Sequence, residues 1–103
     1  MYRGDIPPNS TVNVKLSTDS ANSGSAIMMV GTGAFGGQAT GTSVVVAPGG
    51  SGSRQVKSPA AGILKVFVDF ADDDDSGRLD LSAPGGFTDG DEIAGDTVWT
   101  YSA

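Results

Sequence analysis

The chain has 103 residues, of which 38% are apolar, 17% are charged and 16 are glycines, with no cysteine and no histidine. This length suits one domain with its own core. The two missing residue types exclude disulfides, thiol nucleophiles and imidazole ligands or bases. The net charge of −6 disfavours nucleic acid as a partner, because an acidic surface repels phosphates. No apolar run approaches the ~20 residues that span a membrane, so membrane insertion is not expected either.

Residues 1–9 are expected to form an extended N-terminal arm, and residues 10–103 a single domain. Pro7 and Pro8 each fix φ and remove a backbone donor, which favours extended over helical geometry. The arm also contains Arg3-Gly4-Asp5, the tripeptide that integrins recognise. An extended arm with unpaired backbone groups could lie along the sheet edge of a neighbouring molecule.

The remaining chain alternates between short β-type segments and turn-forming stretches rich in Gly, Ser, Asn and Pro. No window repeats apolar residues at intervals of three and four, so no helix longer than one turn is expected. Residues 87–95 are acidic and are interpreted as a loop. The pattern predicts a small antiparallel β-sandwich, jelly-roll or immunoglobulin-like, with six to eight short strands. The expected strands are residues 11–16, 26–30, 42–47, 54–58, 64–70, 78–81 and 97–102.

The segment from Ala26 to Val30, with the sequence AIMMV, is apolar at every position. A half-buried strand would alternate between apolar and polar residues. This segment is therefore expected to be a central strand that is covered on both sides. The alternative is a strand whose second face packs on a partner chain.

The acidic stretch from Asp72 to Asp80 resembles the first nine positions of the EF-hand calcium loop. Its sequence DDDDSGRLD puts oxygen-bearing side chains at positions 1, 3, 5 and 9, which are Asp72, Asp74, Ser76 and Asp80. Gly77 stands at position 6, where the loop turns sharply, and the backbone carbonyl of Arg78 would be the ligand at position 7. The resemblance implies a Ca²⁺ site, because this hard cation takes six to eight oxygen ligands. It is limited to this short stretch, and position 12 is Ala83 in place of the bidentate Glu.

A complete calcium shell would need further ligands from elsewhere in the chain. Ten of the twelve acidic residues lie between Asp69 and Asp96. Asp89 and Asp91 are predicted to complete the shell if the segment 87–96 folds beside the loop. The alternative is a solvated hairpin turn, in which Ser76-Gly77 takes the tight positions and the aspartates face water.

Three aromatic residues form a candidate contact patch. Trp99 and Tyr101 fall on one face of the last expected strand, and Phe67 shares an outward face with Lys65 and Asp69. Paired aromatic residues on a strand can cover the end of a core, line a protein interface or stack on sugar rings. All three interpretations remain open from the sequence.

These features favour a non-catalytic structural or assembly module, such as a subunit of a surface layer, a filament or a virion. Enzymatic function is not expected, because a serine nucleophile needs an adjacent base and a pair of catalytic aspartates needs a concave site. The alternative function is a calcium-assisted carbohydrate-binding module. The expected partners are further copies of the chain or another protein assembly, or carbohydrate in the alternative, at an extracellular or virion-surface location.

Overall fold

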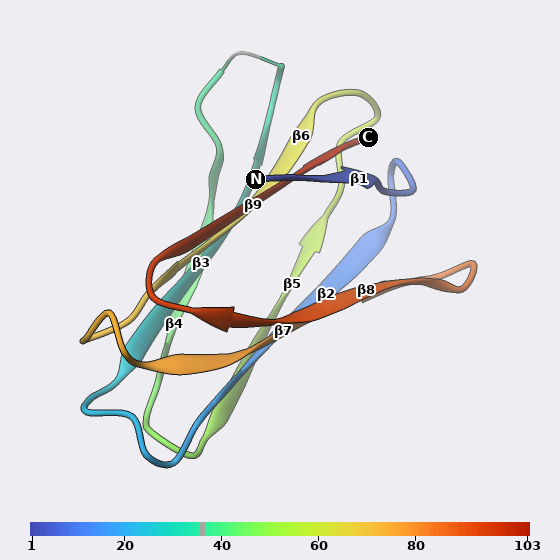
Figure 1. The fold of residues 1–103 in the computed structure, drawn as a ribbon. Helices are drawn as coiled ribbons and strands as arrows, with labels where there is room; N and C mark the ends of the chain where they lie inside the picture. Colours follow the sequence, from blue (N-terminus) through green and yellow to red (C-terminus); the bar gives the residue numbers. More distant parts are fainter. Residues whose placement is uncertain (36) are drawn as a thin grey trace.

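The computed structural model describes residues 1–35 and 37–103, which form two β-sheets packed face to face (Figure 1). The described residues contain nine strands and no helix. In chain order the strands are β1 (Tyr2–Asp5), β2 (Thr11–Thr18), β3 (Ala26–Gly33), β4 (Thr40–Val46), β5 (Ser51–Lys57), β6 (Ile63–Asp69), β7 (Ser76–Ala83), β8 (Phe87–Ala94) and β9 (Thr97–Ser102).

The five-stranded sheet has the order β1-β9-β6-β3-β4, and the four-stranded sheet has the order β5-β2-β7-β8. Neighbouring strands are antiparallel except for β1 and β9, which are parallel. The order β9-β6-β3-β4 matches strands G, F, C and C′ of variable-type immunoglobulin sandwiches, and β2 beside β5 matches strands B and E. The hairpin β7–β8 lies beside β2, where that fold has strand A. The predicted β-sandwich is therefore confirmed, but β6 and β9 are separated in the chain by β7 and β8 of the other sheet, whereas strands F and G of an immunoglobulin domain are consecutive.

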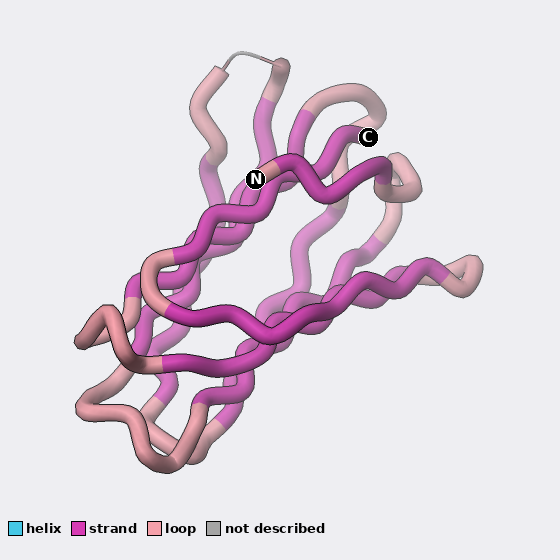
Figure 2. The backbone as a smooth tube through the Cα atoms, viewed as in Figure 1, coloured by secondary structure: helices cyan, strands magenta, loops and turns pink. Residues whose placement is uncertain are grey.

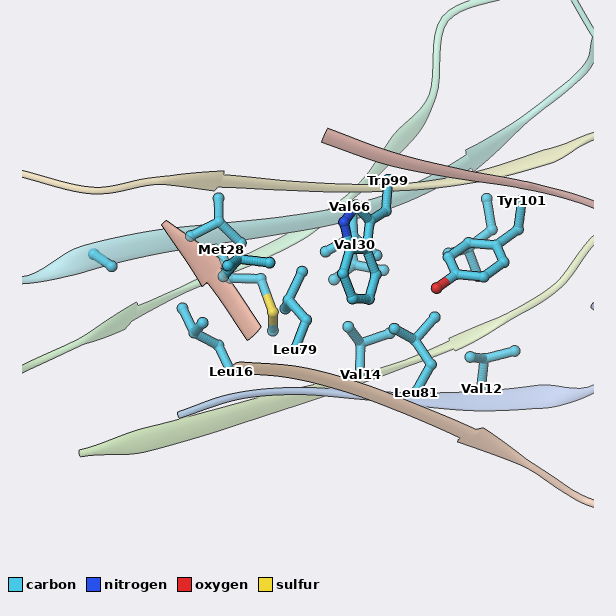
Figure 3. Close-up of a cluster of buried hydrophobic side chains, with 14 of the residues drawn as sticks. Val12, Val14, Leu16, Met28, Val30, Val66, Leu79, Leu81, Trp99 and Tyr101 are labelled. Atoms are coloured by element: carbon cyan, nitrogen blue, oxygen red, sulfur yellow. The ribbon is translucent and has the colours of Figure 1, made fainter. Parts of the chain in front are cut away.

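The core lies between the sheets and is built by alternate residues of the central strands. Val12, Val14 and Leu16 of β2 are fully buried, whereas the residues between them point outward. Figure 3 shows the rings of Trp99 and Tyr101 projecting from β9 toward the four-stranded sheet. Burial of these apolar side chains is the main force that holds the two sheets together.

Strand β8 corrects the interpretation of residues 87–95 as a loop. The segment pairs with β7 along its length, from Ala83 opposite Phe87 to Ser76 opposite Ala94. Two of its inward positions are held by aspartates instead of apolar residues, so the alternation that predicts a strand is hidden. The described residues therefore contain nine strands, whereas six to eight were expected, and β1 and β8 are the additional ones.

The N-terminal segment lies on the edge of its own sheet. Strand β1 pairs with β9, and the backbone N–H of Ile6 donates to Ser102 O at 2.9 Å. The Ile6 side chain is part of the core. Figure 2 shows the loops gathered at the ends of the strands, so that the two broad outer faces are made of strand residues.

Candidate interaction surface

The acidic turn between β6 and β7 is held by hydrogen bonds within the protein. The backbone N–H of Asp74 donates to Asp72 Oδ1 at 2.9 Å, which is an Asx-type turn. The Asp75 side chain is 4% exposed and accepts hydrogen bonds from Ser23 N at 2.8 Å and from Ser23 Oγ at 3.0 Å. These contacts anchor the turn to the loop between β2 and β3.

Asn22 fixes the start of β7 in a similar way. Its Nδ2 donates to Ser76 O at 2.8 Å, and Ser76 N donates to Asn22 Oδ1 at 3.0 Å. The sequence reasoning did not single out Asn22, Ser23 or Asp75, because their pairing joins segments far apart in the chain. Their only signal in the sequence is that Asn22 and Ser23 lie in a polar, turn-forming stretch.

The seven predicted calcium ligands do not come together. They are spread over the turn (Asp72 and Asp74), strand β7 (Ser76, Arg78 and Asp80) and strand β8 (Asp89 and Asp91). The antiparallel register places Ala94 beside the turn, and Asp89 is five residues further along, roughly 17 Å away at about 3.4 Å per residue. Among the described residues, no three His, Cys, Asp or Glu side chains are grouped so that they could hold a metal ion. Segment 87–96 does return beside β7, but as a strand that separates the acids.

The inward-facing acids of β8 are paired with Arg3 of β1. Arg3 Nε donates to Asp89 Oδ2 at 3.0 Å and Nη2 donates to Oδ1 at 2.9 Å, while Nη1 lies 3.7 Å from Asp91 Oδ2. The guanidinium carbon is 4.0 Å from the centroid of the Trp99 ring, and the Tyr101 hydroxyl donates to Asp89 Oδ2 at 2.7 Å. We call these residues the Arg3 cluster. It joins the edge of the five-stranded sheet to the edge of the four-stranded sheet and closes one side of the sandwich.

The Arg3 cluster shifts the ionisation of its members. Hydrogen bonding from Arg3 holds the pKa of Asp89 below its usual range, and the Tyr101 hydrogen bond lowers it further, although partial burial acts in the opposite direction. Burial raises the pKa of Tyr101, and the Asp89 carboxylate raises it again. The ion pair and the tyrosine donor therefore both persist at neutral pH. Because Arg3 is engaged in this way, the Arg3-Gly4-Asp5 tripeptide does not present its arginine to an integrin.

The predicted patch of Phe67, Trp99 and Tyr101 does not form on the surface. Trp99 and Tyr101 are 2% and 1% exposed (Figure 3), and the Tyr101 ring meets Phe87 edge-on at 6.3 Å. Their face of β9 points toward the four-stranded sheet, so it packs in the core. Of the three residues, only Phe67 lies on the outward face, and a sugar-stacking pair on β9 is excluded.

The outer face of the five-stranded sheet carries a group of exposed apolar side chains. Ile27 and Met29 of β3 are 40% and 43% exposed, Val98 of β9 is 38% exposed and Val45 of β4 is 65% exposed. Phe67 of β6 is half-buried between its cross-strand neighbours Met29 and Val98. We call these five residues the apolar face. The interpretation of segment 26–30 as covered on both sides is thus wrong within one molecule, and its packing on a partner chain stays a prediction.

The outer face of the four-stranded sheet is polar. Its central strand β2 has the same buried–exposed alternation as β3, but its outward residues are hydrophilic. The outward positions of β5, β2, β7 and β8, read from the register, are Ser51, Ser53, Gln55, Lys57, Thr11, Asn13, Lys15, Ser17, Ser76, Arg78, Asp80, Ser82, Thr88, Gly90, Glu92 and Ala94.

A shallow hollow of about 330 Å³ adjoins the apolar face. Its lining includes Gly31 and Gly41, which are opposite each other on β3 and β4, and Ala39, which lies over Gly31. Its walls include Met29, Phe67 and Lys65. The glycine at position 41 also has a local cause, because a Cβ there would collide with the Val30 carbonyl.

Two carboxylates meet at the margin of the apolar face. Asp69 is the last residue of β6, and the register of β6 and β9 places it next to Asp96. Side-chain hydrogen bonding with Asp96 and the charge of Asp96 raise the pKa of Asp69. Both residues are exposed. Two neighbouring carboxylates repel each other once both are ionised, so this pair is unfavourable at neutral pH.

Comparisons of the chain with protein-family models, with curated proteins and with solved structures found no match. Within the described residues, no helix has the length and apolar character needed to cross a membrane.

Proposed function

We propose that this protein is a non-catalytic structural module that assembles with other protein molecules through the apolar face. The observation that carries the proposal is the exposure of Ile27, Met29, Val45, Phe67 and Val98 together on one sheet. Contiguous exposed apolar groups on a soluble protein mark contact sites. Methionine and aromatic residues are enriched at the centres of protein interfaces, and charged residues are depleted there.

A non-catalytic role is supported by the chemistry of the hollow beside the apolar face and of the Arg3 cluster. Among the described residues that line the hollow, Lys65 is the only titratable one, and a lysine without a second titratable group nearby has no partner for acid–base work. In the Arg3 cluster, the charged groups form hydrogen bonds and ion pairs with one another. Neither place offers a nucleophile beside a base.

The alternative of a calcium-assisted carbohydrate-binding module gains no support from the geometry. The aromatic pair that it requires is in the core, and two of its calcium ligands are engaged by Arg3. Membership of a surface layer, filament or virion, at an extracellular or virion-surface location, stays a prediction of the sequence.

Sedimentation velocity over micromolar to millimolar concentrations tests the proposal. We expect the wild-type chain to self-associate, and the double variant Ile27→Ser with Met29→Ser to remain monomeric. The matched control is Asn13→Ser with Lys15→Ser, which changes two outward residues of the central strand in the other sheet. A wild-type chain that is monomeric at every concentration would overturn the proposal, and so would association that the Ile27 and Met29 changes leave intact.

A further inference from the structure

Three cross-strand rows of the outer face of the five-stranded sheet contain the apolar face and its charged neighbours. The central row is Val98, Phe67, Met29 and Ser43, on β9, β6, β3 and β4. On one side of it lies the acidic row, which is Asp69, Ile27 and Val45, on β6, β3 and β4. On the other side lies the glycine row, which is Lys65, Gly31 and Gly41 on the same three strands.

Charge is distributed with opposite signs on the two outer rows. Lys65 and Asp69 are on the same strand, two positions to either side of Phe67, and their Cα atoms are about 13 Å apart at about 3.3 Å per residue. They do not pair within one molecule, and Lys65 has no ion pair among the described residues. Asp69 instead contacts the carboxylate of Asp96, so the acidic row lacks a cation that the glycine row can supply.

The two outer rows also differ in shape. The acidic row projects two aliphatic side chains, Ile27 and Val45, and both are well exposed. On the same two strands the glycine row has Gly31 and Gly41, which line the hollow of about 330 Å³ together with Ala39. The hollow therefore lies on the opposite side of the central row from Ile27 and Val45.

We propose that two copies of the chain pack these faces together about a two-fold axis that runs along the central row. The inference rests on the proposed function, and it names the partner as a second copy. Rotation about this axis places each β6 over the partner's β6 in the opposite direction. Lys65 then lies over Asp69 of the second copy, Ile27 over Gly31 and Val45 over Gly41. Such an interface is isologous, because the same patch is used by both copies, and two sheets pack in this aligned manner when their strands are within about 30°.

The other simple two-fold arrangement has its axis along β6. It places Lys65 over Lys65 and Asp69 over Asp69, and like charges in contact across an interface are strongly unfavourable. It also places the acidic row of one copy over the acidic row of the other. The side chains that project from these rows then meet, and the hollow stays empty. The charge pattern therefore selects the antiparallel arrangement.

The size of the face predicts a weak dimer. Four strands at about 4.8 Å spacing and three rows at about 7 Å spacing cover about 400 Å² of sheet per copy. The two copies together then bury about 800 Å², which is less than the about 1,000 Å² of a stable specific interface, so the association is transient. We expect dissociation in the micromolar range or weaker, and assembly then depends on several copies being held close together.

Sedimentation equilibrium with charge-reversal variants of the full chain tests the arrangement. Lys65→Asp places two acids opposite each other, and Asp69→Lys places two lysines opposite each other. Each variant alone should self-associate about tenfold or more weakly than the wild type, since like charges then face each other across the interface. An equimolar mixture of the two variants should regain the wild-type affinity, because each introduced aspartate then faces an introduced lysine. Lys57→Asp, on the polar outer face, changes the net charge as much as Lys65→Asp does and should leave association unchanged.

Each remaining outcome overturns the arrangement in a recognisable way. Single variants that associate as tightly as the wild type, together with a mixture that binds more tightly, would indicate the axis along β6. Association that is lost in Ile27→Ser with Met29→Ser but insensitive to the charge reversals would leave the assembly function standing with a different partner geometry. A wild type that never associates would overturn the proposed function itself.

Discussion

The two outer faces of the sandwich have the same backbone pattern and opposite surface chemistry. Strands β2 and β3 each lie inside a sheet and each alternate buried and outward residues. The outward residues of β2 include Asn13 and Lys15, whereas those of β3 are Ile27 and Met29. The polar face shows that this sandwich does not need apolar residues on its outside. Those on β3 and its neighbours therefore point to contact with another molecule.

The largest expected effect on stability comes from a core residue of β9, and it is compared with a substitution on the outward side of the same strand. Trp99→Ala removes a large side chain from the core and should lower the free energy of unfolding by about 3–5 kcal/mol. Val98→Thr changes the adjacent outward residue with little change in volume and should alter stability by less than about 0.5 kcal/mol. Urea denaturation of both variants checks the contrast. Similar losses in the two variants would mean that the outer face also contributes to the fold.

The second prediction concerns the edge where the two sheets meet at the Arg3 cluster. Arg3→Ala removes a two-point ion pair and a cation–π contact, and leaves Asp89 with Tyr101 as its remaining side-chain donor, so we expect a loss of about 1–3 kcal/mol. The Arg3 and Asp89 side chains are 17% and 26% exposed, so solvent screens this contact only in part. Urea denaturation measures the loss, and Arg54→Ala, a change to a more exposed contact on the other side of the sandwich, is the control.

The same contact should make stability depend on pH. The pKa of Asp89 is lower in the folded protein than in the unfolded chain, so its contribution is present above the unfolded pKa and is lost as pH falls through the folded pKa. Thermal melts from neutral pH down to acid should show this loss in the wild type. Arg3→Ala should reduce it, and an unchanged acid profile in that variant would contradict the assignment.

A smaller effect of opposite sign is expected at Asp69 and Asp96. The pKa of Asp69 is raised in the folded protein, so the favourable shared-proton contact exists at low pH and is lost as pH rises through the folded pKa. Asp96→Asn should therefore raise the melting temperature slightly at neutral pH and have no such benefit in acid. Asp73→Asn, which removes an exposed charge from the nearby turn, is the control, and an equal gain in that variant would indicate general charge repulsion instead.

The smallest expected effect concerns calcium. With Asp89 and Asp91 paired to Arg3 and distant from the acidic turn, Asp72 and Asp74 are left without the additional ligands that the ion requires. Melting curves in millimolar Ca²⁺ and in excess chelator should coincide, because an ion that does not bind the native state does not stabilise it. A shift of several degrees that Asp72→Asn abolishes would show that the turn rearranges to bind calcium.

The sequence by itself determined the fold class and most of the strands, because alternation is a local property. In β2, β6 and β9 the apolar residues alternate along the strand, which is the period-two pattern of a half-buried strand. The same local rule failed for β8, where Asp89 occupies an inward position and is paired with Arg3 from the other end of the chain. The sequence also identified Ala26–Val30 as a strand with two apolar faces, and it left open what the second face contacts.

The tertiary structure decided which candidate residues lie together. The EF-hand-like spacing of Asp72, Asp74 and Asp80 is a local pattern, but a calcium shell needs ligands from a second segment, and the β7–β8 register carries those ligands away from the turn. Likewise, the sequence places Trp99 and Tyr101 on one side of a strand, and only sheet packing decides that this side faces inward. The apolar face is a property of four strands that are distant in the chain and adjacent in the sheet. Its existence could be established only when their order and register were known.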